Sequence, residues 1–345
     1  MTVSSVHSMR VYTGGWKQFE GTAAAWDLAL AGLCGSNFYQ CHAWGEVKRR
    51  LGWEVLRLTH PQACAQVLFR RYPLGLVLAW IPGGVAGLPA AWAGTLHDAI
   101  RRAACATVLY TRLNGLQVNN AAGGAAAQDG VLPALISANW HRPAARLESG
   151  LTLRCDLVAD ESVRLLRASG NWRHNLKRSA NHGLRVTLWD TPDVTVVSRI
   201  YRALEAHKGL APQVSEVALS AQVELLTQHL IVMRCDDNAG QPIAIRAAVL
   251  FGDTAWDFLA AATPAARKVY ASHATLWALQ KVCAERGALR YDMGGADPQG
   301  NKGVFDFKRG TGADLIEYAG EWEQASNSLV RWVANTAIRR RGAIS

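Results

Sequence analysis

A glycine-rich basic segment near the C-terminal end of the sequence could stabilise a developing negative charge. Residues 300–312 interleave glycines with Phe307, Lys308 and Arg309. A glycine-framed loop of cations brings backbone N–H groups and positive charge close to an anion, or to the oxyanion of an acyl transfer. Lys308 is therefore a candidate for stabilising the oxyanion, and Phe307 a candidate for walling the site or stacking on a nucleobase. The alternative is a core Phe307 beside a solvated Lys308 in a hairpin.

Asp292 ends the apolar strand that leads into this segment. Its carboxylate could accept a proton as a general base. An aspartate directly before Met293-Gly294-Gly295 also fixes a turn by accepting hydrogen bonds from backbone N–H groups, and this is the stronger interpretation. Asp292 is therefore a catalytic candidate with a structural alternative.

A second group of candidates lies nearer the N-terminal end. Gln40, Trp44 and Lys48 are spaced by four residues, so they share one face wherever this segment is helical. On such a face Lys48 belongs either to a binding site or to the exposed surface of the helix.

A basic helix is expected at residues 171–181. Arg173 and Lys177 are four residues apart, as are His174 and Arg178, so like charges are neighbours on its surface. Such pairs cost a few tenths of a kcal/mol unless a polyanion neutralises them. An RNA backbone is one such polyanion, and a solvated basic face is the alternative.

The elements that must position these residues follow an alternating α/β order. In the first half, hydrophobic periodicity predicts helices at 22–33, 44–51 and 90–104 and strands at 53–59, 65–71, 76–81 and 107–113. In the second half, it predicts helices at 171–181, 194–207, 215–228 and 272–286 and strands at 184–189, 230–235, 243–251, 255–261 and 289–293. Residues 121–130 are predicted to form a loop, and 326–340 a final helix.

One succession of elements occurs twice. Strand, strand, loop, helix and strand follow one another over 65–113 and again over 243–293, which indicates two copies of one α/β unit. A chain of 345 residues also exceeds the usual size of a single core. We predict domains at 1–154 and 155–320, with a C-terminal helix within 321–345 that packs back onto the first.

The composition predicts a globular protein with an anionic partner. Half of the residues are hydrophobic, 19% are charged, and the formal net charge is +10, which favours nucleic acid, nucleotide phosphates or an anionic membrane surface over a neutral partner. No apolar run is long enough for a membrane span, and no secretory signal is evident. Seven scattered cysteines indicate reduced thiols, so we expect a cytoplasmic protein without a metal site.

Four segments resemble the Fem-type (FemABX) aminoacyltransferase family. They are 38–48 with 52–53, then 80–84, then 175–186, and finally 291–295 with 303–312 and 317–322, and they occur in the family's order. The resemblance implies an α/β fold of two tandem GNAT-like (acyl-CoA N-acyltransferase-like) domains, with mixed sheets flanked by helices and no coiled-coil arm.

The resemblance also implies an activity. Family members move an amino acid from aminoacyl-tRNA to an amine of the peptidoglycan precursor's stem peptide. The expected partners are aminoacyl-tRNA as co-substrate and a UDP-linked or lipid-linked muropeptide precursor, with peripheral contact at the inner membrane face, and no further cofactor.

Residue roles follow from the matching positions. Lys48, with Trp44 and Gln40 beside it, would bind the diphosphate of the precursor, and Lys208 would add a second cation where the family favours arginine. Phe307 and Lys308 would handle the aminoacyl end of the tRNA. The residues expected to contact the tRNA itself are Arg173, Lys177, Arg178 and Arg309.

One departure keeps other activities open. Asn114 stands where the family often has an aspartate, so the proton acceptor is not identified. Residues 267–273 precede a helix at the place where acetyltransferases bind coenzyme A, but no glycine lies between Gly252 and Gly287, which argues against a standard acetyl-CoA site. The alternatives are an acetyl-CoA-dependent N-acyltransferase acting on a sugar or exopolysaccharide precursor, and a non-catalytic RNA- or envelope-binding protein.

Overall fold

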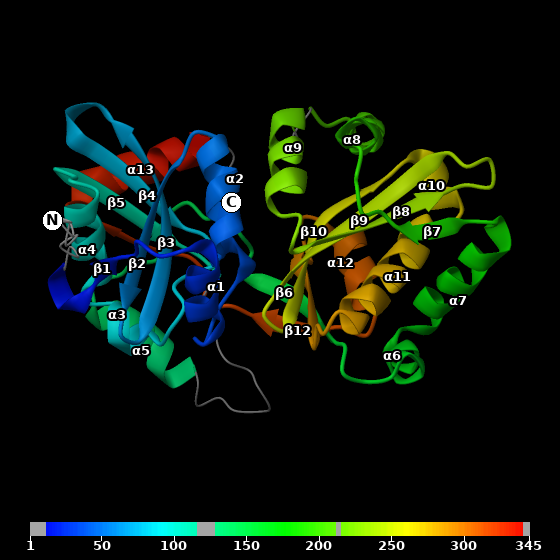
Figure 1. Cartoon of the computed structure of the whole chain (residues 1–345), viewed down its shortest axis with the longest axis horizontal. Coiled ribbons are helices and arrows are strands. Elements are labelled where there is room, and N and C mark those ends of the chain that lie inside the picture. Colours follow the sequence, from blue (N-terminus) through cyan, green and yellow to red (C-terminus); the bar gives the residue numbers. More distant parts are fainter. Residues whose placement is uncertain (1–11, 116–127, 212–214, 341–345) are drawn as a thin grey trace, which may run out of the picture. The chain divides into compact units, whose positions relative to one another are not determined.

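The computed structural model describes residues 12–115, 128–211 and 215–340, and the chain divides into two compact units. Unit 1 comprises residues 1–150 and 317–345, and unit 2 comprises 151–316. Each unit is a mixed sheet flanked by helices, which confirms the predicted α/β fold class (Figure 1). None of the helices in the described ranges is long and apolar enough to cross a membrane.

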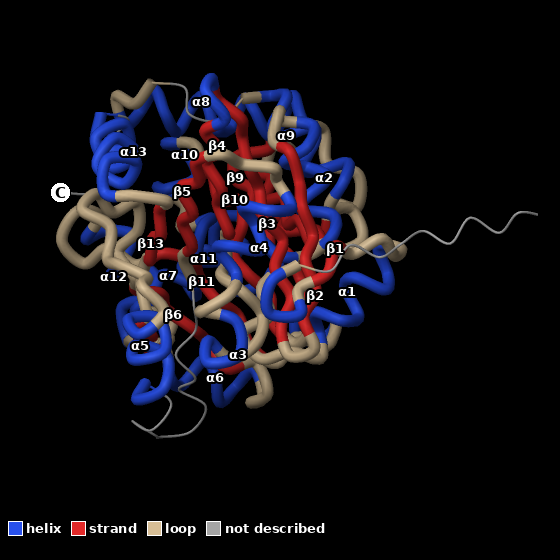
Figure 2. The backbone as a smooth tube through the Cα atoms, turned by 90° about the vertical axis from the view of Figure 1, so that its left-hand side faces the viewer, coloured by secondary structure: helices blue, strands red, loops and turns tan. Residues whose placement is uncertain are grey.

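Unit 1 is built on a six-stranded sheet. Its strands, in spatial order, are β1 (Lys17–Gln18), β2 (Glu54–His60), β3 (Ala63–Tyr72), β4 (Leu76–Ile81), β5 (Val108–Leu113) and β13 (Trp322–Ala325). Its helices are α1 (Ala23–Ala31), α2 (His42–Arg50), α3 (Pro89–Trp92), α4 (Leu96–Ala103), α5 (Gln128–Ser137) and α13 (Ser328–Arg340). Helix α13 lies beside β5 and β13 (Figure 2), so the C-terminal end of the chain packs in unit 1.

Unit 2 is built on a seven-stranded sheet. Its strands, in spatial order, are β12 (Asp314–Glu317), β6 (Leu151–Asp156), β11 (Arg290–Gly295), β10 (Thr254–Ala262), β9 (Pro242–Phe251), β8 (Leu230–Asp236) and β7 (Arg185–Leu188). Its helices are α6 (Glu161–Arg167), α7 (Gly170–Ser179), α8 (Val194–Lys208), α9 (Glu216–Leu225), α10 (Pro264–Lys268), α11 (Ala271–Glu285) and α12 (Lys302–Arg309).

The repeated α/β succession is present in both units. An antiparallel pair, β3–β4 or β9–β10, leads through a helix to a strand that runs parallel to the second member of the pair. The helix is α4 in unit 1 and α11 in unit 2. A parallel return requires such a crossover helix, so the order of elements and the strand directions support each other.

The two parallel pairs differ in a way that positions a site. In unit 1, β4 and β5 stay paired along the full length of both strands, from Leu76↔Val108 to Ile81↔Leu113. In unit 2, β10 and β11 pair only from Thr254↔Arg290 to Trp256↔Asp292, and a bulge follows in β10 after Asp257. Bulges bend a strand and redirect its side chains. The strands of unit 2 therefore separate just beyond Trp256.

Two sequence predictions about these elements are wrong. Residues 90–104 form two helices, α3 and α4, because the chain bends at Ala93-Gly94-Thr95 between them. Residues 300–312 are not a loop, since 302–309 form helix α12. The glycines stand at its ends, at Gly303 in the first turn and Gly310 at the C-cap, and the buried residues Phe305 and Lys308 are three apart on one helical face.

The sequence also left several elements unpredicted. Strands β1, β6, β12 and β13 and helices α5 and α6 belong to this group. Residues 128–130, which were assigned to a loop, lie in α5, and residues 121–127 of that predicted loop fall outside the described residues.

Candidate active site

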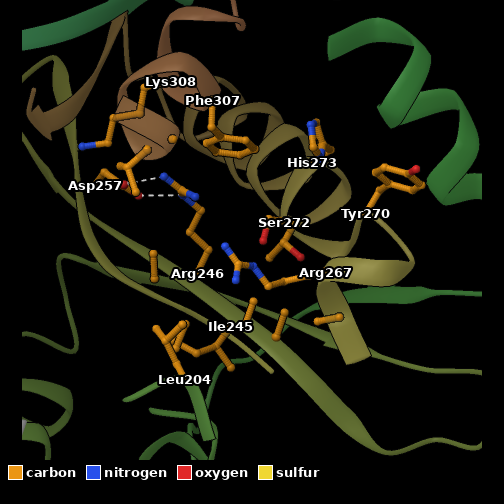
Figure 3. A pocket seen from close by; sticks show the side chains of 18 of the residues that line it. Leu204, Ile245, Arg246, Asp257, Arg267, Tyr270, Ser272, His273, Phe307 and Lys308 are labelled. Atoms are coloured by element: carbon orange, nitrogen blue, oxygen red, sulfur yellow. Dashed lines mark hydrogen bonds and ion pairs between the residues drawn. The ribbon is translucent and has the colours of Figure 1, made fainter. Parts of the chain in front are cut away.

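A cavity of about 550 Å³ opens in unit 2 where β10 and β11 separate (Figure 3). Strands β9 and β10 form one wall, and α12 and the first turn of α11 form the other. Lys308 and Asp257 lie toward one end, Tyr270 and His273 toward the other, and Phe307 stands between them. Such a concave, mostly apolar cavity with a few converging polar groups is the usual form of a ligand site.

Lys308 is held in this cavity by backbone carbonyl groups. Its Nζ donates to the carbonyl oxygens of Gly294 at 3.2 Å and Gly295 at 2.9 Å, at the end of β11. The side chain is only 9% exposed. Burial lowers the pKa of Lys308 below its usual value of 10.5, with Asp257 opposing this shift and Arg246 adding to it. The position and direction of this ammonium group are therefore fixed.

A buried ion pair forms the floor of the cavity beside Lys308. Arg246 on β9 and Asp257 on β10 make a two-bond contact, Nε–Oδ1 at 2.8 Å and Nη2–Oδ2 at 2.5 Å. The hydroxyl of Tyr291 on β11 also donates to Asp257 Oδ1 at 2.8 Å. Burial disfavours the Arg246 cation, but Asp257 and Tyr291 outweigh it, so the pKa of Arg246 is raised. The pair links β9, β10 and β11 at the point where the sheet opens.

Phe307 forms an aromatic wall of the cavity. Its ring lies 5.0 Å from that of His273 at an interplanar angle of 81°, and 6.4 Å from that of Trp172 on α7. Arg246 approaches it from the other side, with its Cζ 5.6 Å from the ring centroid. A ring held in this way can present an apolar face to a ligand in the cavity.

His273 is neutral in this aromatic cluster, and this gives a pH prediction. Burial lowers its pKa from 6.5 to about 4. As the pH falls from 6.5 toward 4, the unfolded chain therefore takes up a proton that the folded protein does not, so the free energy of unfolding should decrease. His97 in unit 1, whose pKa burial also lowers to about 4, should contribute in the same direction.

Urea unfolding measured across this pH range tests the prediction. We expect His273→Phe to make the stability of unit 2 less dependent on pH, with His97→Leu doing the same for unit 1. If the His273→Phe slope matched that of the wild type, His273 would have to be protonated in the folded protein.

Three backbone N–H groups in the loop between β10 and α11 donate hydrogen bonds within the loop itself. Helix α10 occupies it, with Ala266 N donating to Thr263 Oγ1 at 3.2 Å and Arg267 N to the carbonyl oxygen of Thr263 at 3.3 Å. Tyr270 N donates to the carbonyl oxygen of Arg267 at 3.4 Å. Tyr270 itself has φ +57, a left-handed conformation that few side chains adopt. These groups are not arranged as a row of donors for a diphosphate.

Several other predicted residues lie around the same cavity. Lys208, at the end of α8, lines its rim. Arg178 on α7 stacks over Tyr270, with its Cζ 4.6 Å from the ring centroid. Arg173 instead donates to the carbonyl oxygen of Leu166 at 3.1 Å. Lys177 and Arg309 are exposed on α7 and α12, outside the cavity lining.

Asp292 is occupied by structural contacts. Its Oδ1 accepts hydrogen bonds from Thr152 Oγ1 at 2.6 Å and from Gly294 N at 2.9 Å, and Arg154 lies 3.6 Å from Oδ2. The side chain is 2% exposed and does not line the cavity. These contacts match the turn-fixing interpretation, because Gly294 has φ +68 and makes the turn that Asp292 caps.

The unit 1 candidates form a cation–aromatic cluster. Lys48 Nζ lies 4.5 Å from the ring centroid of Trp44 and 5.7 Å from that of Trp80. Arg70 stacks on Trp53 at 4.5 Å. Burial, with a smaller contribution from Arg70, lowers the pKa of Lys48. Among the described residues, neither Lys48 nor Arg70 forms an ion pair with a carboxylate, so the two cations are available to an anion.

Gln40 does not belong to this half-buried cluster. It lies in a 3₁₀ turn before α2, so the helical spacing to Trp44 is broken, and it is fully buried. Its Nε2 donates to the carbonyl oxygens of Gln66 at 3.1 Å and Pro82 at 2.8 Å, and its Oε1 accepts from Gln66 N at 2.6 Å. The expectation that Gln40 contacts substrate is therefore wrong, because both ends of its amide hold β3 to its neighbours.

Asn114, the departure from the family pattern, follows β5 and is 7% exposed. Its Nδ2 donates to the carboxylate of Glu148. A carboxylate therefore lies beside this position, although the residue after the strand is an amide. Across the described residues, no cluster of three or more His, Cys, Asp or Glu side chains could hold a metal ion.

Sequence reasoning missed the residues that define the floor and the far end of the cavity. These are Arg246, Asp257, Tyr270, His273 and Tyr291. A signal existed, since Arg246 is the single charge in the strand 242–251 and Asp257 the single charge in 254–262. Charged residues in strands that are otherwise apolar are expected to be paired and buried.

Comparisons with known proteins agree with this architecture. Residues 219–339 match the model of the FemAB family. The crystal structure of FemX superposes with a TM-score of 0.76 at 14% identity, covering 92% of this chain and 99% of that one. No match was found among curated protein sequences.

Two further structures share the fold. The C-terminal DUF2156 domain of a putative lysylphosphatidylglycerol synthetase from Agrobacterium fabrum has a TM-score of 0.56 at 12% identity, covering 91% of this chain and 96% of that one. A tandem GNAT protein from the clavulanic acid biosynthesis pathway has a TM-score of 0.52 at 12% identity, covering 90% and 98%. The chain therefore has a Fem-type tandem GNAT-like fold, and its residues 219–339 match the FemAB family model.

Proposed function

We propose that the protein transfers an amino acid from aminoacyl-tRNA to an amine of a peptidoglycan precursor's stem peptide. The observation that carries the proposal is Lys308, a buried ammonium group fixed at a cavity within the stretch that matches the FemAB family. The cavity would receive the aminoacyl-adenosine end of the tRNA, with Phe307 against the base or the amino-acid side chain.

The chemistry requires charge stabilisation more than a strong base. The amine nitrogen forms a bond to the ester carbonyl carbon, and the ester C–O bond breaks. One proton leaves the amine, and the ribose oxygen takes one up. The intermediate carries an oxyanion, which Lys308 would stabilise from its fixed position. Holding both substrates together supplies much of the remaining rate.

The geometry of the α10 loop favours this reading over an acetyl-CoA-dependent enzyme. Coenzyme A would need N–H donors for its diphosphate in the loop before α11 as well as at the start of that helix. Here the N–H groups of Ala266, Arg267 and Tyr270 are bonded within α10 and its caps. Arg178 over Tyr270, together with the exposed Lys177 next to it in sequence and the exposed Arg309 next to Lys308, supplies positive charge that suits an RNA strand.

The acceptor's diphosphate would bind the cation–aromatic cluster of unit 1. Lys48 and Arg70 both lack a carboxylate partner among the described residues, so a phosphate would relieve their repulsion. Lys208 would supply a separate cation at the rim of the unit 2 cavity. In this proposal aminoacyl-tRNA is the co-substrate and no metal or further cofactor takes part.

Removing the two unit 1 cations should weaken acceptor binding. We expect Lys48→Met and Arg70→Met each to raise KM for the precursor about 10- to 100-fold, because a charge-assisted hydrogen bond is worth about 1.5–3 kcal/mol. The value of kcat at saturating precursor should change much less. Lys17→Met, an exposed lysine of the same unit, is the matched control and should leave KM unchanged.

The proposed function is tested by incubating the protein with a mixture of charged tRNAs and with UDP-linked and lipid-linked precursors. Mass spectrometry of the precursor should show the mass increment of one amino acid. An acetyl increment that depends on acetyl-CoA would establish the acetyltransferase alternative. If neither appears with any donor, the protein binds RNA or envelope components without catalysis.

A further inference from the structure

Helix α13 directs an apolar face outward. Leu329, Trp332 and Val333 are three and four residues apart, and their side chains are 66%, 65% and 46% exposed. The residue that α13 buries instead is polar, since Asn335 is 5% exposed and its Nδ2 donates to both carboxylate oxygens of Glu323, at 3.0 and 2.8 Å. A surface helix normally buries its apolar stripe and exposes its polar one, so we expect a binding partner to cover this face.

Arginines accompany the apolar face on the same helix. Helix α13 contains Arg331, Arg339 and Arg340, and the sequence after Glu323 contains no aspartate or glutamate. The segment 141–147 lies against the helix. It adds an exposed leucine, Leu147, and three further basic residues, His141, Arg142 and Arg146.

Specific bonds hold this segment to the helix. Arg339 Nη2 donates to the carbonyl oxygen of Ala144 at 3.0 Å, and Ala145 N donates to Asn335 Oδ1 at 3.0 Å. A cavity of about 360 Å³ lies at the junction, with Arg142, Arg331, Arg339 and Trp332 among its lining. The carboxylate in that lining, Glu323, is already engaged by Tyr110 Oη at 2.6 Å and by Asn335.

We propose that α13 and the segment 141–147 form a docking surface for an anionic lipid bilayer. Leu329, Trp332 and Val333 would enter the boundary between headgroups and acyl chains, where an indole ring is favoured. The arginines around them would bind lipid phosphates, and the cavity beside Trp332 has room for one phosphate group. Insertion of these apolar side chains, combined with the attraction of arginines to anionic headgroups, gives reversible binding at the membrane surface.

The composition of the surface favours a bilayer over other occupants. A second copy of the chain in a two-fold dimer would place the same arginines opposite one another. An RNA strand would pair with the arginines but leave Leu329 and Val333 without a partner. A bilayer with anionic headgroups accounts for both the charge and the exposed apolar side chains.

Vesicle sedimentation with the full-length protein tests the inference. We expect binding to vesicles of equal parts phosphatidylcholine and phosphatidylglycerol, no binding to phosphatidylcholine alone, and weaker binding as salt is raised. Trp332→Ser and the double variant Arg339→Glu/Arg340→Glu should each reduce partitioning at least about tenfold.

Two matched variants control for general effects. Leu166→Ser alters a leucine on α6 that is 73% exposed, and it should bind like the wild type, whereas Leu329→Ser should not. Arg199→Glu on α8 changes the net charge by the same step as a single arginine reversal in α13 and should have little effect. Equal losses in the control and α13 variants, or binding that ignores lipid charge, would overturn the inference.

Oligomeric state separates the bilayer from a second copy. If the wild type sediments as a dimer that Trp332→Ser dissociates, and does not bind anionic vesicles, the apolar face is a subunit interface and the proposal is wrong. The vesicle experiment needs neither tRNA nor precursor. Its outcome therefore does not depend on the proposed transfer activity, and either can fail without the other.

Discussion

Lys308→Ala is expected to lower kcat/KM for aminoacyl transfer about 100- to 1000-fold, the usual loss when one oxyanion-stabilising donor is removed. The effect should fall mainly on kcat, because the ammonium group would act most strongly on charge that develops in the transition state. Among the described residues Lys308 forms no ion pair, and its Nζ donates to carbonyl oxygens, so its removal should leave the fold intact.

Lys302→Ala is the matched control for this variant. Lys302 lies on the same helix, its side chain is 74% exposed, and it pairs with Asp306 at 2.7 Å. We expect its activity to stay within about twofold of the wild type, since an exposed pair contributes little. If Lys308→Ala were as active as Lys302→Ala, Lys308 would not take part in the reaction.

Asp257→Asn is expected to destabilise unit 2 by about 3–5 kcal/mol, the usual cost of leaving a buried cation without its partner. Asp257 and Arg246 are each 8% exposed, so water cannot replace the lost contact. Asparagine keeps the size of the side chain, and the loss therefore reports the charge. Urea unfolding, combined with hydrogen exchange of peptides from β9 and β10, would measure the effect where it arises.

The exposed pair Asp253–Arg290 provides the comparison in the same sheet. Its side chains are 46% and 45% exposed and lie 2.6 Å apart. Asp253→Asn should cost at most about 1 kcal/mol, because water screens the charge that remains. Equal losses in the two variants would mean that Arg246 finds another partner or is hydrated in the folded protein.

The duplicated fold explains why one unit has this cavity. Both units bring a strand back parallel to its predecessor, but in unit 1 the pairing of β4 with β5 continues to Ile81↔Leu113 and leaves no gap. In unit 2, pairing of β10 with β11 ends at Trp256↔Asp292. Asp257, the last residue of β10 before the bulge, bonds Arg246 at the opening. The extent of strand pairing thus decides whether the parallel pair opens toward a cavity.

The sequence predicted the α/β order because its strands are apolar and its helices end at recognisable stops. The helix at 171–181, for instance, was expected to end at Gly183, and that residue is left-handed with φ +63. Short edge strands such as β13 were missed, since four residues carry too little periodicity. Helix α12 was taken for a loop because its glycines, which cap the ends, suggested flexibility.

The candidate site was predictable only in part. Lys308 and Phe307 were found through a resemblance, and the structure shows what holds them, namely the carbonyl oxygens of Gly294 and Gly295 and the His273 ring. The Arg246–Asp257 pair joins two strands: a lone charge in each apolar strand predicts a buried partner, but only the strand register shows which residue that partner is. Gln40 failed as a candidate because a spacing of four residues places side chains on one face only within a continuous helix, and the chain is not continuously helical before α2.

The measurement closest to the central claim is a crystal structure of the protein with an amide-linked 3′-aminoacyl-adenosine, a stable form of the tRNA end. We expect the ligand in the unit 2 cavity, with its carbonyl oxygen within hydrogen-bonding distance of Lys308 Nζ and an aromatic or apolar group against Phe307. A ligand bound elsewhere, with the cavity unoccupied and Lys308 still bonded only to Gly294 and Gly295, would contradict the assignment.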